Sequence, residues 1–142
     1  MSINKLTTAL LVPVIGLSLV VFLQLTRPPE LFMGGTRYFY EVAKTPESQR
    51  KGLSNRKSLA EDHALLFVYE RASILEYWMK DMNFPIDIVW MDETYTVLHI
   101  DRHVLPGSYP KTYSSEQPAK YVIEVNAGRA SEVSVGDIVY VQ

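Results

Sequence analysis

The sequence predicts a mainly β domain, a compact antiparallel sandwich or barrel with one short helix, preceded by a single transmembrane helix. Three observations lead to this prediction. Short runs rich in Val, Ile, Tyr, Phe and Trp recur throughout residues 36–142, and each has the length of a β-strand. Only one good helix signal stands among these runs. An uncharged segment that is long enough to cross a bilayer precedes them.

The uncharged segment covers residues 6–26. At the helical rise its residues span about 31 Å, close to the hydrocarbon thickness of about 30 Å. A cleaved signal peptide, the alternative, has a shorter apolar region and a small-residue cleavage site. We therefore expect a tail at 1–5, a transmembrane signal anchor at 6–26, a stalk at 27–35 and an extracytoplasmic β domain at 36–142.

The orientation of this anchor follows from weaker signals. Lys5 precedes the segment while Arg27 and Arg37 follow it, so the positive-inside count is almost balanced. The short N-terminal tail favours an inside N-terminus, with the domain on the extracytoplasmic, periplasmic side of the cell membrane. A domain that faces the cytoplasm is the alternative.

Seven apolar runs predict the strands of the domain. They cover residues 37–43, 65–70, 74–79, 86–91, 95–100, 120–125 and 137–141. The fourth and fifth runs are separated by only three residues, at hairpin spacing, so we expect them to be antiparallel neighbours. Residues 105–118 contain three prolines and predict a long loop.

The short helix is predicted from local signals between the first two strand runs. Thr45 is suited to the N-cap, and Pro46 to the first helical position. Glu47 favours the positive end of the helix dipole, and Gly52 can adopt the left-handed conformation that ends a helix. The resulting helix has barely two turns.

Composition excludes several classes of function. The chain has 14 Lys and Arg against 16 Asp and Glu, so it lacks the positive excess of a general nucleic-acid binder. Without cysteine it has no disulfide, thiolate metal site or cysteine nucleophile. It also contains no nucleophile elbow and no phosphate-binding glycine loop. We therefore expect no cofactor, no metal, no nucleic-acid partner and no enzymatic activity.

Several short segments carry a family resemblance by their order along the chain. They are Val42, Ala43, Thr45 and Pro46; Arg50, Gly52, Leu53, Arg56 and Leu59; Leu65, Leu66 and Phe67; Trp78, Met79 and Lys80; Pro85, Ile86, Asp87 and Ile88; Tyr121, Val122, Ile123 and Glu124; and Gly128, Gly136 and Asp137. In this order they resemble the bacterial and archaeal domain of unknown function 192, over about residues 38–141. The resemblance implies a small, mostly β domain, commonly exported or membrane-tethered, with no established activity.

The chain departs from the family pattern after Lys80. The usual Asn-Thr pair is Asp81 and Met82 here, so an amide has become an acid and a hydroxyl is absent. Before the Leu-Phe pair, the usual Gly-Met is Ala64 and Leu65, which is a conservative packing change. The departure at Asp81 affects any site that needs the amide or the hydroxyl.

Trp78 and Lys80 are the first candidates for a binding site. Strand alternation places them on one face, with Met79 and Asp81 on the other. Such a face would bind an anionic or sugar-like ligand by ring stacking and a point charge. In the alternative, Trp78 belongs to the core and Lys80 pairs with Asp87 or Glu124.

Four basic residues lie around the predicted helix end, at positions 50, 51, 56 and 57. They are either a local anion site or a solvated face, and the solvated face is favoured because cations complement the negative end of a helix dipole. Arg56 occupies a family position, where a guanidinium is able to brace two loops. The candidates for ligand or partner binding are Arg56, Trp78, Lys80, Asp87 and Glu124.

His99, Asp101 and His103 recur at a spacing of two, so in a strand they share one face. The two histidines are two steps apart, too far to share a metal ion unless the strand bends. An exposed polar face is favoured over a metal site.

These features lead to three hypotheses about function. The leading one is a single-span membrane protein whose β domain is a non-catalytic accessory or scaffolding subunit of a larger membrane complex. Its partners would be the lipid bilayer and one or more membrane proteins. The alternative is a binding module for a small anionic or saccharide ligand. The third is a hydrolase that uses Asp87 and Glu124 as paired carboxylates.

Overall fold

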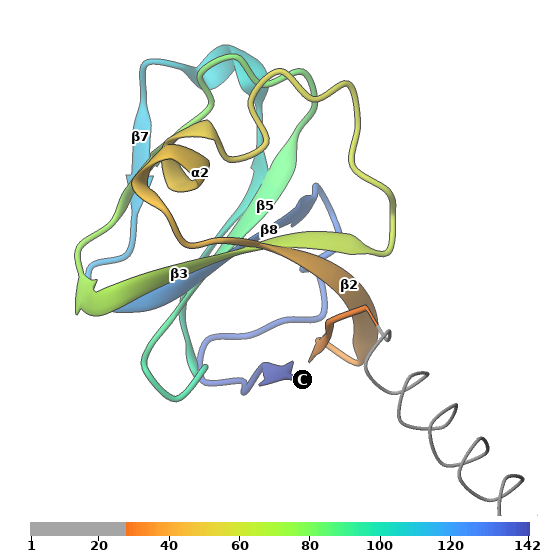
Figure 1. The fold of residues 1–142 in the computed structure, drawn as a ribbon, viewed down its shortest axis with the longest axis vertical. Coiled ribbons are helices and arrows are strands. Elements are labelled where there is room, and N and C mark those ends of the chain that lie inside the picture. Colours follow the sequence, from red (N-terminus) through yellow and green to blue (C-terminus); the bar gives the residue numbers. More distant parts are fainter. Residues whose placement is uncertain (1–27) are drawn as a thin grey trace, which may run out of the picture.

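The structure, a computed structural model, describes residues 28–142 as a mainly β fold with one short α-helix (Figure 1). The predicted tail and transmembrane helix lie outside the described residues. Within residues 28–142, no helix has the length and apolar character needed to cross a membrane.

Seven strands form the main sheet, in the order β6-β5-β8-β3-β2-β1-β9. Their bounds are β1 (Glu30–Met33), β2 (Thr36–Ala43), β3 (His63–Ser73), β5 (Ile86–Met91), β6 (Val97–Val104), β8 (Ala119–Asn126) and β9 (Tyr140–Val141). A second sheet pairs β4 (Glu76–Trp78) with β7 (Thr112–Ser114). The helices are α2 (Pro46–Lys51) and the 3-10 turn η1 (Pro106–Ser108).

One strand pair differs from the predicted antiparallel arrangement. β2 and β3 run parallel, with Val42 opposite Leu66, whereas the other pairs of the described sheets are antiparallel. The chain between them includes α2 and is long enough to return to the starting end of the sheet, which a parallel pair requires. This crossover places α2 over one face of the sheet (Figure 1).

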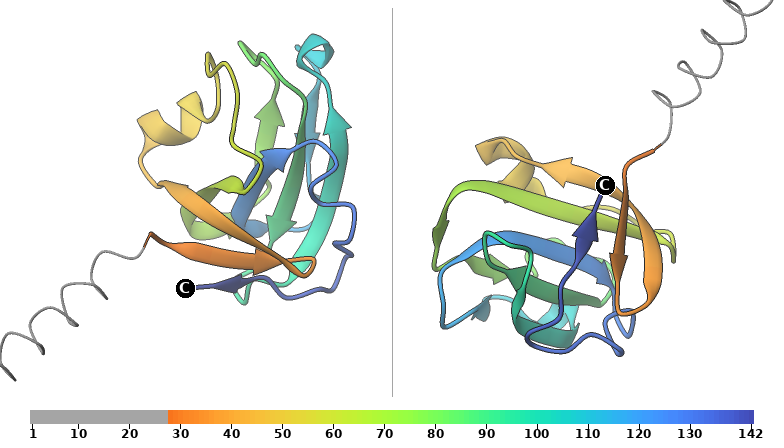
Figure 2. Two further views of the ribbon diagram at one scale, coloured as in Figure 1. Left: turned by 90° about the vertical axis from the view of Figure 1, so that its right-hand side faces the viewer. Right: turned by 90° about the horizontal axis from the view of Figure 1, so that it is seen from below.

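The main sheet curls into a half-barrel (Figure 2). The segment before β9 bridges the two edges at one end, because Ile138 pairs with Thr96 next to β6. In the same segment, the Val97 amide donates to the Asp137 carbonyl oxygen at 2.8 Å. β9 then pairs with β1 at the opposite edge, with Val141 opposite Leu31. The domain is thus an open, curled sheet where the sequence predicted a sandwich or barrel.

Apolar side chains cover both faces of the central strands. All six residues of β5 are buried, and its five apolar residues are divided between two core clusters. Ile88 and Trp90 belong to the cluster on the α2 side, while Val89 and Met91 belong to the cluster inside the curl. In the register of the sheet, Glu124 lies between Leu65 and Ile88 and therefore faces the α2 side.

The predicted local elements agree well with the structure. Thr45 caps α2 through its side-chain oxygen, which accepts from the Ser48 amide at 3.2 Å, and Gly52 ends the helix at φ +48°. β5 and β6 form the predicted hairpin, with two register shifts.

Two segments carry more structure than the sequence predicted. The expected stalk, 27–35, contains β1, which pairs with both β2 and β9. The expected loop, 105–118, contains η1 and β7. The last predicted strand, 137–141, is shorter than expected, because only Tyr140 and Val141 pair as a strand.

Candidate ligand-binding site

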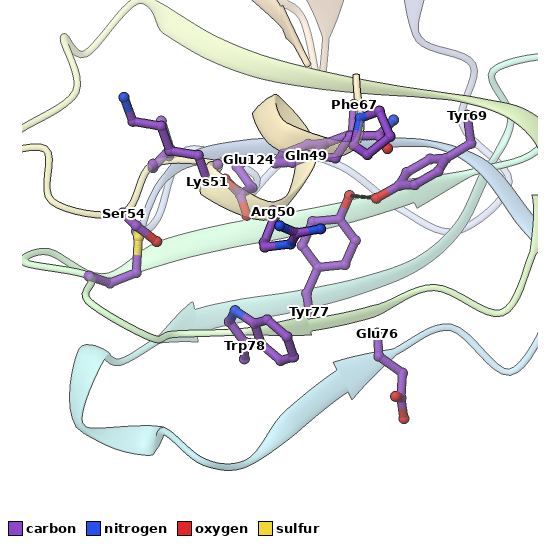
Figure 3. A pocket seen from close by; sticks show the side chains of 14 residues that line it. Gln49, Arg50, Lys51, Ser54, Phe67, Tyr69, Glu76, Tyr77, Trp78 and Glu124 are labelled. Atoms are coloured by element: carbon purple, nitrogen blue, oxygen red, sulfur yellow. Dashed lines mark hydrogen bonds between the residues drawn. The ribbon is translucent and has the colours of Figure 1, made fainter. Parts of the chain in front are cut away.

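A cavity of about 320 Å³ lies beneath α2 (Figure 3). Five parts of the chain line it: α2 with the residues that follow it, β3, β4, the loop after β4 at Met82, and β8. Because the crossover brings α2 back over the sheet, residues far apart in the sequence meet here. The cavity joins the region of the short helix to Trp78 and Glu124, two of the predicted site residues.

Aromatic side chains form one wall of the cavity. The rings of Phe67 and Tyr77 meet edge to face, with centroids 5.0 Å apart. The hydroxyl groups of Tyr69 and Tyr77 lie 3.0 Å apart and share a hydrogen bond (Figure 3). Burial raises the pKa of both hydroxyls above the usual value of 10, so they stay protonated in neutral solution. Trp78 follows on the same strand and is 48% exposed.

Glu124 is the buried acid of the cavity. Its side chain stands among the apolar residues on the α2 side of the sheet, and 6% of the residue is exposed. Its Oε2 atom has no hydrogen-bond partner among the described residues. Removal of the charged form from water raises the pKa of Glu124 to about 8, against the opposing effect of the Arg56 charge. The group is therefore mostly a neutral carboxylic acid at pH 7.

Gly52 leaves space beside this acid. A Cβ atom at Gly52 would lie 3.7 Å from Oε2 of Glu124 and 3.4 Å from the Phe67 ring. The same glycine has φ +48°, a conformation that side-chain-bearing residues rarely adopt. The C-terminal end of α2 thus shapes the cavity next to its buried acid.

Two cations from the last turn of α2 line the cavity, Arg50 and Lys51. Within residues 28–142 neither of them forms an ion pair. Gln49 fixes the helix that carries them, because its Nε2 donates to the Val68 carbonyl oxygen on β3 at 2.8 Å. The positive charges are held on a helix that is tied to the sheet.

Two loops that border the cavity, 52–57 and 79–84, are joined by polar contacts. The contacts are Ser54 Oγ to the Lys80 carbonyl oxygen at 2.9 Å, the Asn55 amide to the Asp81 carbonyl oxygen at 2.8 Å, and Asn83 Nδ2 to the Arg56 carbonyl oxygen at 2.8 Å. Asn55 and Asp81 both have positive φ, which Asn and Asp tolerate best among non-glycine residues. The acid at position 81 thus suits the same backbone conformation as the usual asparagine.

Of the five predicted site residues, the structure brings Trp78 and Glu124 into the cavity. Arg56 lies close enough for its charge to affect Glu124, but its own partner is Glu41. Lys80 does not line the cavity, because β4 ends at Trp78 and the strand alternation ends with it. The predicted ion pair of Lys80 with Asp87 or Glu124 is not present in the described residues.

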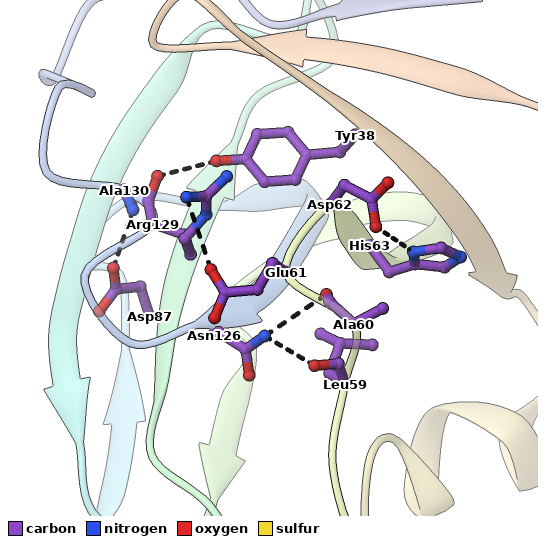
Figure 4. A network of polar contacts seen from close by, with 10 residues as sticks. All are labelled: Tyr38, Leu59, Ala60, Glu61, Asp62, His63, Asp87, Asn126, Arg129 and Ala130. Atoms are coloured by element: carbon purple, nitrogen blue, oxygen red, sulfur yellow. Dashed lines mark hydrogen bonds and ion pairs between the residues drawn. The ribbon is translucent and has the colours of Figure 1, made fainter.

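Asp87 lies outside the cavity and connects parts of the fold through hydrogen bonds (Figure 4). It is fully buried on β5, and its two carboxylate oxygens accept from the His103 amide at 2.8 Å and the Ala130 amide at 2.9 Å. It joins the end of β6 to the turn after β8. Asp87 and Glu124 therefore do not form the paired carboxylates of the hydrolase hypothesis.

Sequence reasoning missed the tyrosine pair and the role of Gly52. Tyr69 and Tyr77 belong to different strand runs, and nothing in their spacing indicates that their hydroxyls meet. Arg50 and Lys51 belonged to a cluster considered as a local anion site, but a solvated face that complements the helix end was favoured for it. The position of Gly52 after the predicted helix indicated its role as the helix end. It did not indicate that Gly52 lies beside Glu124.

The period-two motif lies on β6. His99 Nε2 and Asp101 Oδ2 are 3.2 Å apart, on side chains that are partly exposed. The strand alternation that would place His103 on the same face as these two residues is interrupted at His103, which has φ +52°. Among residues 28–142 no group of three His, Cys, Asp or Glu side chains is arranged to hold a metal ion.

Comparison with known proteins gives a family and three matching chains among the solved structures. The model of the family DUF192, described as Uncharacterized ACR, matches residues 31–141. No curated protein is significantly similar to the chain.

Two of these solved relatives share the fold over most of this chain. One is a protein from Sinorhizobium meliloti 1021, named as a candidate transcription regulator. It has 28% identity and a TM-score of 0.73, and the match covers 80% of this chain and 91% of that one. The other is a protein of unknown function from Novosphingobium aromaticivorans DSM 12444. It has 25% identity and a TM-score of 0.72, with 80% and 83% coverage.

Proposed function

This chain belongs to the DUF192 family, and from that premise we propose that its β domain is a binding module for a small anionic or saccharide ligand, held in the cavity beneath α2. One observation carries the proposal. A buried carboxyl oxygen, Oε2 of Glu124, lies in this cavity without a hydrogen-bond partner in the described chain. Buried polar groups are almost always paired, so an unpaired one that borders a cavity favours a ligand as its partner.

The composition of the cavity supports the same function. Ligand pockets combine apolar and aromatic walls with a few polar groups that orient the ligand. Here Tyr77 and Trp78 supply the aromatic surface, while Arg50 and Lys51 supply positive charge. Polar contacts hold the bordering loops, so the binding groups are positioned before a ligand arrives.

Binding is favoured over hydrolysis by the position of Asp87. Hydrolysis by paired carboxylates needs two groups that face one substrate. Both oxygens of Asp87 are occupied by backbone amides outside the cavity.

The test is a thermal-shift screen of the full-length chain in mild detergent, against a panel of small carboxylates, phosphates, sugars and sugar acids. A ligand at 100 times its Kd stabilises the folded state by about 2.7 kcal/mol, which raises Tm by several degrees. Trp78→Ala should abolish the shift. Ile74→Ala, which removes an exposed apolar side chain outside the cavity, should keep it. A panel without any shift, or an equal shift in both variants, would overturn the proposal.

The membrane role is proposed on a separate basis, the uncharged segment 6–26. This segment would hold the module at the extracytoplasmic face of the membrane. For the module in this position we also propose an accessory role in a larger membrane complex. Since the chain has no cysteine, a single Ser108→Cys variant allows labelling of intact cells with a membrane-impermeant thiol reagent. Labelling supports an outside domain, and labelling only after lysis contradicts it. Co-purification of one stoichiometric membrane protein in mild detergent supports the accessory role, and migration of the chain alone contradicts it.

A further inference from the structure

The charges of the cavity beneath α2 do not balance. Arg50 and Lys51 line it with positive charge, and Glu76 lines it with negative charge. Glu124 adds no charge while it is protonated, which its burial favours at neutral pH. Tyr69 and Tyr77, the other ionisable groups near Glu124, are also neutral. The lining thus carries one net positive charge, and the charge of Arg56 nearby is paired with Glu41.

The aromatic groups present a surface on the other side of the same cavity. Figure 3 shows Arg50 coming from α2 and Trp78 coming from β4, on two sides of the cavity. Trp78 is half-exposed although it is a large apolar side chain. A sugar ring has an apolar C–H face that packs on an aromatic ring, and polar edges that need hydrogen bonds. An exposed indole beside polar groups offers a surface for the apolar face of the sugar and hydrogen-bonding partners for its polar edges.

The deep end of the cavity offers both donors and acceptors. A protonated Glu124 carboxyl has one donor and free acceptor capacity. Each hydroxyl of a sugar also donates and accepts, so it can satisfy both functions of the acid. An ionised carboxylate would instead repel a negatively charged ligand, and the neutral form removes this repulsion.

We infer that the cavity binds a sugar with a single carboxylate, such as a uronic acid, with its carboxylate toward Arg50 and Lys51, its ring on Trp78 and a hydroxyl on Glu124. This inference rests on the proposed binding function. A volume of about 320 Å³ lies at the small end of ligand pockets, which favours one sugar ring over a longer chain. One net positive charge matches one carboxylate better than a phosphate monoester, which carries nearly two charges. A neutral sugar would leave both cations without a partner.

The inference is tested by isothermal titration of the full-length chain in mild detergent. The probes are D-glucuronate and D-galacturonate, with D-glucose, D-galactose and glucose 6-phosphate as comparison ligands. At pH 7 we expect at least one uronate to bind about tenfold more tightly than its neutral sugar, because a charge-assisted hydrogen bond is added. We also expect it to bind more tightly than glucose 6-phosphate, because the second negative charge of the phosphate exceeds the net charge of the lining. Binding should weaken as the pH rises from 7 to 9, since Glu124 becomes ionised while the uronate carboxylate does not change.

Matched variants separate the groups. Arg50→Gln should weaken uronate binding about tenfold or more and leave binding of the neutral sugar unchanged. Arg71→Gln, which removes an exposed cation outside the cavity, should change neither. Glu124→Gln should remove the pH dependence between 7 and 9, because an amide does not ionise.

The outcomes distinguish this inference from the function on which it rests. Equal affinity for a uronate and its neutral sugar, or tighter binding of the phosphate, overturns the acidic-sugar class and leaves the binding function standing. Absence of binding for all five probes also overturns the class, and the thermal-shift panel then decides on the binding function itself. Selective binding of a uronate that Arg50→Gln does not weaken overturns the assigned orientation.

Discussion

Arg56 donates two hydrogen bonds to Glu41, at 2.7 and 2.9 Å. This bidentate contact directs the guanidinium to the Glu41 carboxylate and lowers the pKa of that group. Glu124 receives only the longer-range effect of the Arg56 charge, which does not offset the cost of its burial. The acid in the cavity is therefore left neutral beside a satisfied ion pair.

The first prediction concerns Glu124 and pH. Its pKa is about 8 in the folded chain and near 4.5 in the unfolded chain, so between these values the folded state retains a proton that the unfolded state has lost. The Glu124 contribution is therefore fully present below about pH 4.5 and is lost as the pH rises to 8, by about 1.4 kcal/mol per pH unit. Glu124→Gln should flatten this slope and be more stable than the unmodified chain at pH 8.

Urea unfolding at pH 5, 6, 7 and 8 measures the effect. Glu93→Gln, at an exposed turn, should follow the slope of the unmodified chain. Parallel slopes for Glu124→Gln and the unmodified chain would show that Glu124 is ionised in the folded state at neutral pH.

The second prediction concerns Asp87. Asn in its place accepts only one of the two backbone amides and turns its own N–H groups toward the other. We expect Asp87→Asn to lose about 3 kcal/mol of unfolding free energy in urea, since hydrogen bonds to a buried charge are among the stronger ones. Asp137→Asn alters one exposed contact, with the Ser134 amide, and should lose about 1 kcal/mol or less. A loss below 1 kcal/mol for Asp87→Asn would contradict its bracing role.

The third prediction uses two glycines with positive φ. Gly52→Ala and Gly35→Ala should each lose about 1–2 kcal/mol of stability, because alanine is strained at these backbone angles. Only the Cβ at position 52 approaches the cavity, beside Glu124, whereas a Cβ at position 35 has no atom within 4 Å. Ligand-induced thermal stabilisation should therefore decrease in Gly52→Ala alone. An equal decrease in both variants would attribute it to strain.

The fourth prediction concerns the cap of α2. Thr45→Ala removes the oxygen that accepts from the Ser48 amide, at a cost of about 1 kcal/mol. Because α2 carries Arg50 and Lys51, we also expect weaker ligand binding in this variant. Ser131→Ala, at an exposed position, should change neither quantity. Unfolding in urea and ligand titration check the two effects, and unchanged stability in Thr45→Ala would show that the cap is not needed.

Short-range signals were enough to predict part of this fold. Thr45, Pro46 and Gly52 fix α2 within one local segment, and the spacing of the β5 and β6 runs predicts their hairpin. The parallel pairing of β2 with β3 was not predictable in the same way. It depends on which end of the sheet the chain reaches after residue 62, and no local pattern records that.

The site was predictable only by its individual residues. Trp78 and Glu124 were both candidates, but their meeting depends on the crossover that places α2 above β8. Strand alternation predicts that the Glu124 side chain points to the opposite face of the sheet from its two neighbours in the strand. It does not predict which face of β8 is covered by α2. Lys80 was assigned to the face of Trp78 on the assumption that the strand continues past Trp78. β4 instead ends at Trp78, and this end is set by long-range pairing with β7, which no local pattern records.

The pairing of β9 with β1 also affects how the chain is made. Residue 31 lies opposite residue 141, so the first strand of the described sheet is fully paired only after residue 141 has been synthesised. During translation, β1 has β2 on one side and an open hydrogen-bonding edge on the other. A nascent chain, or one that terminates before β9, therefore presents that edge to other chains until β9 has been made and has paired with β1.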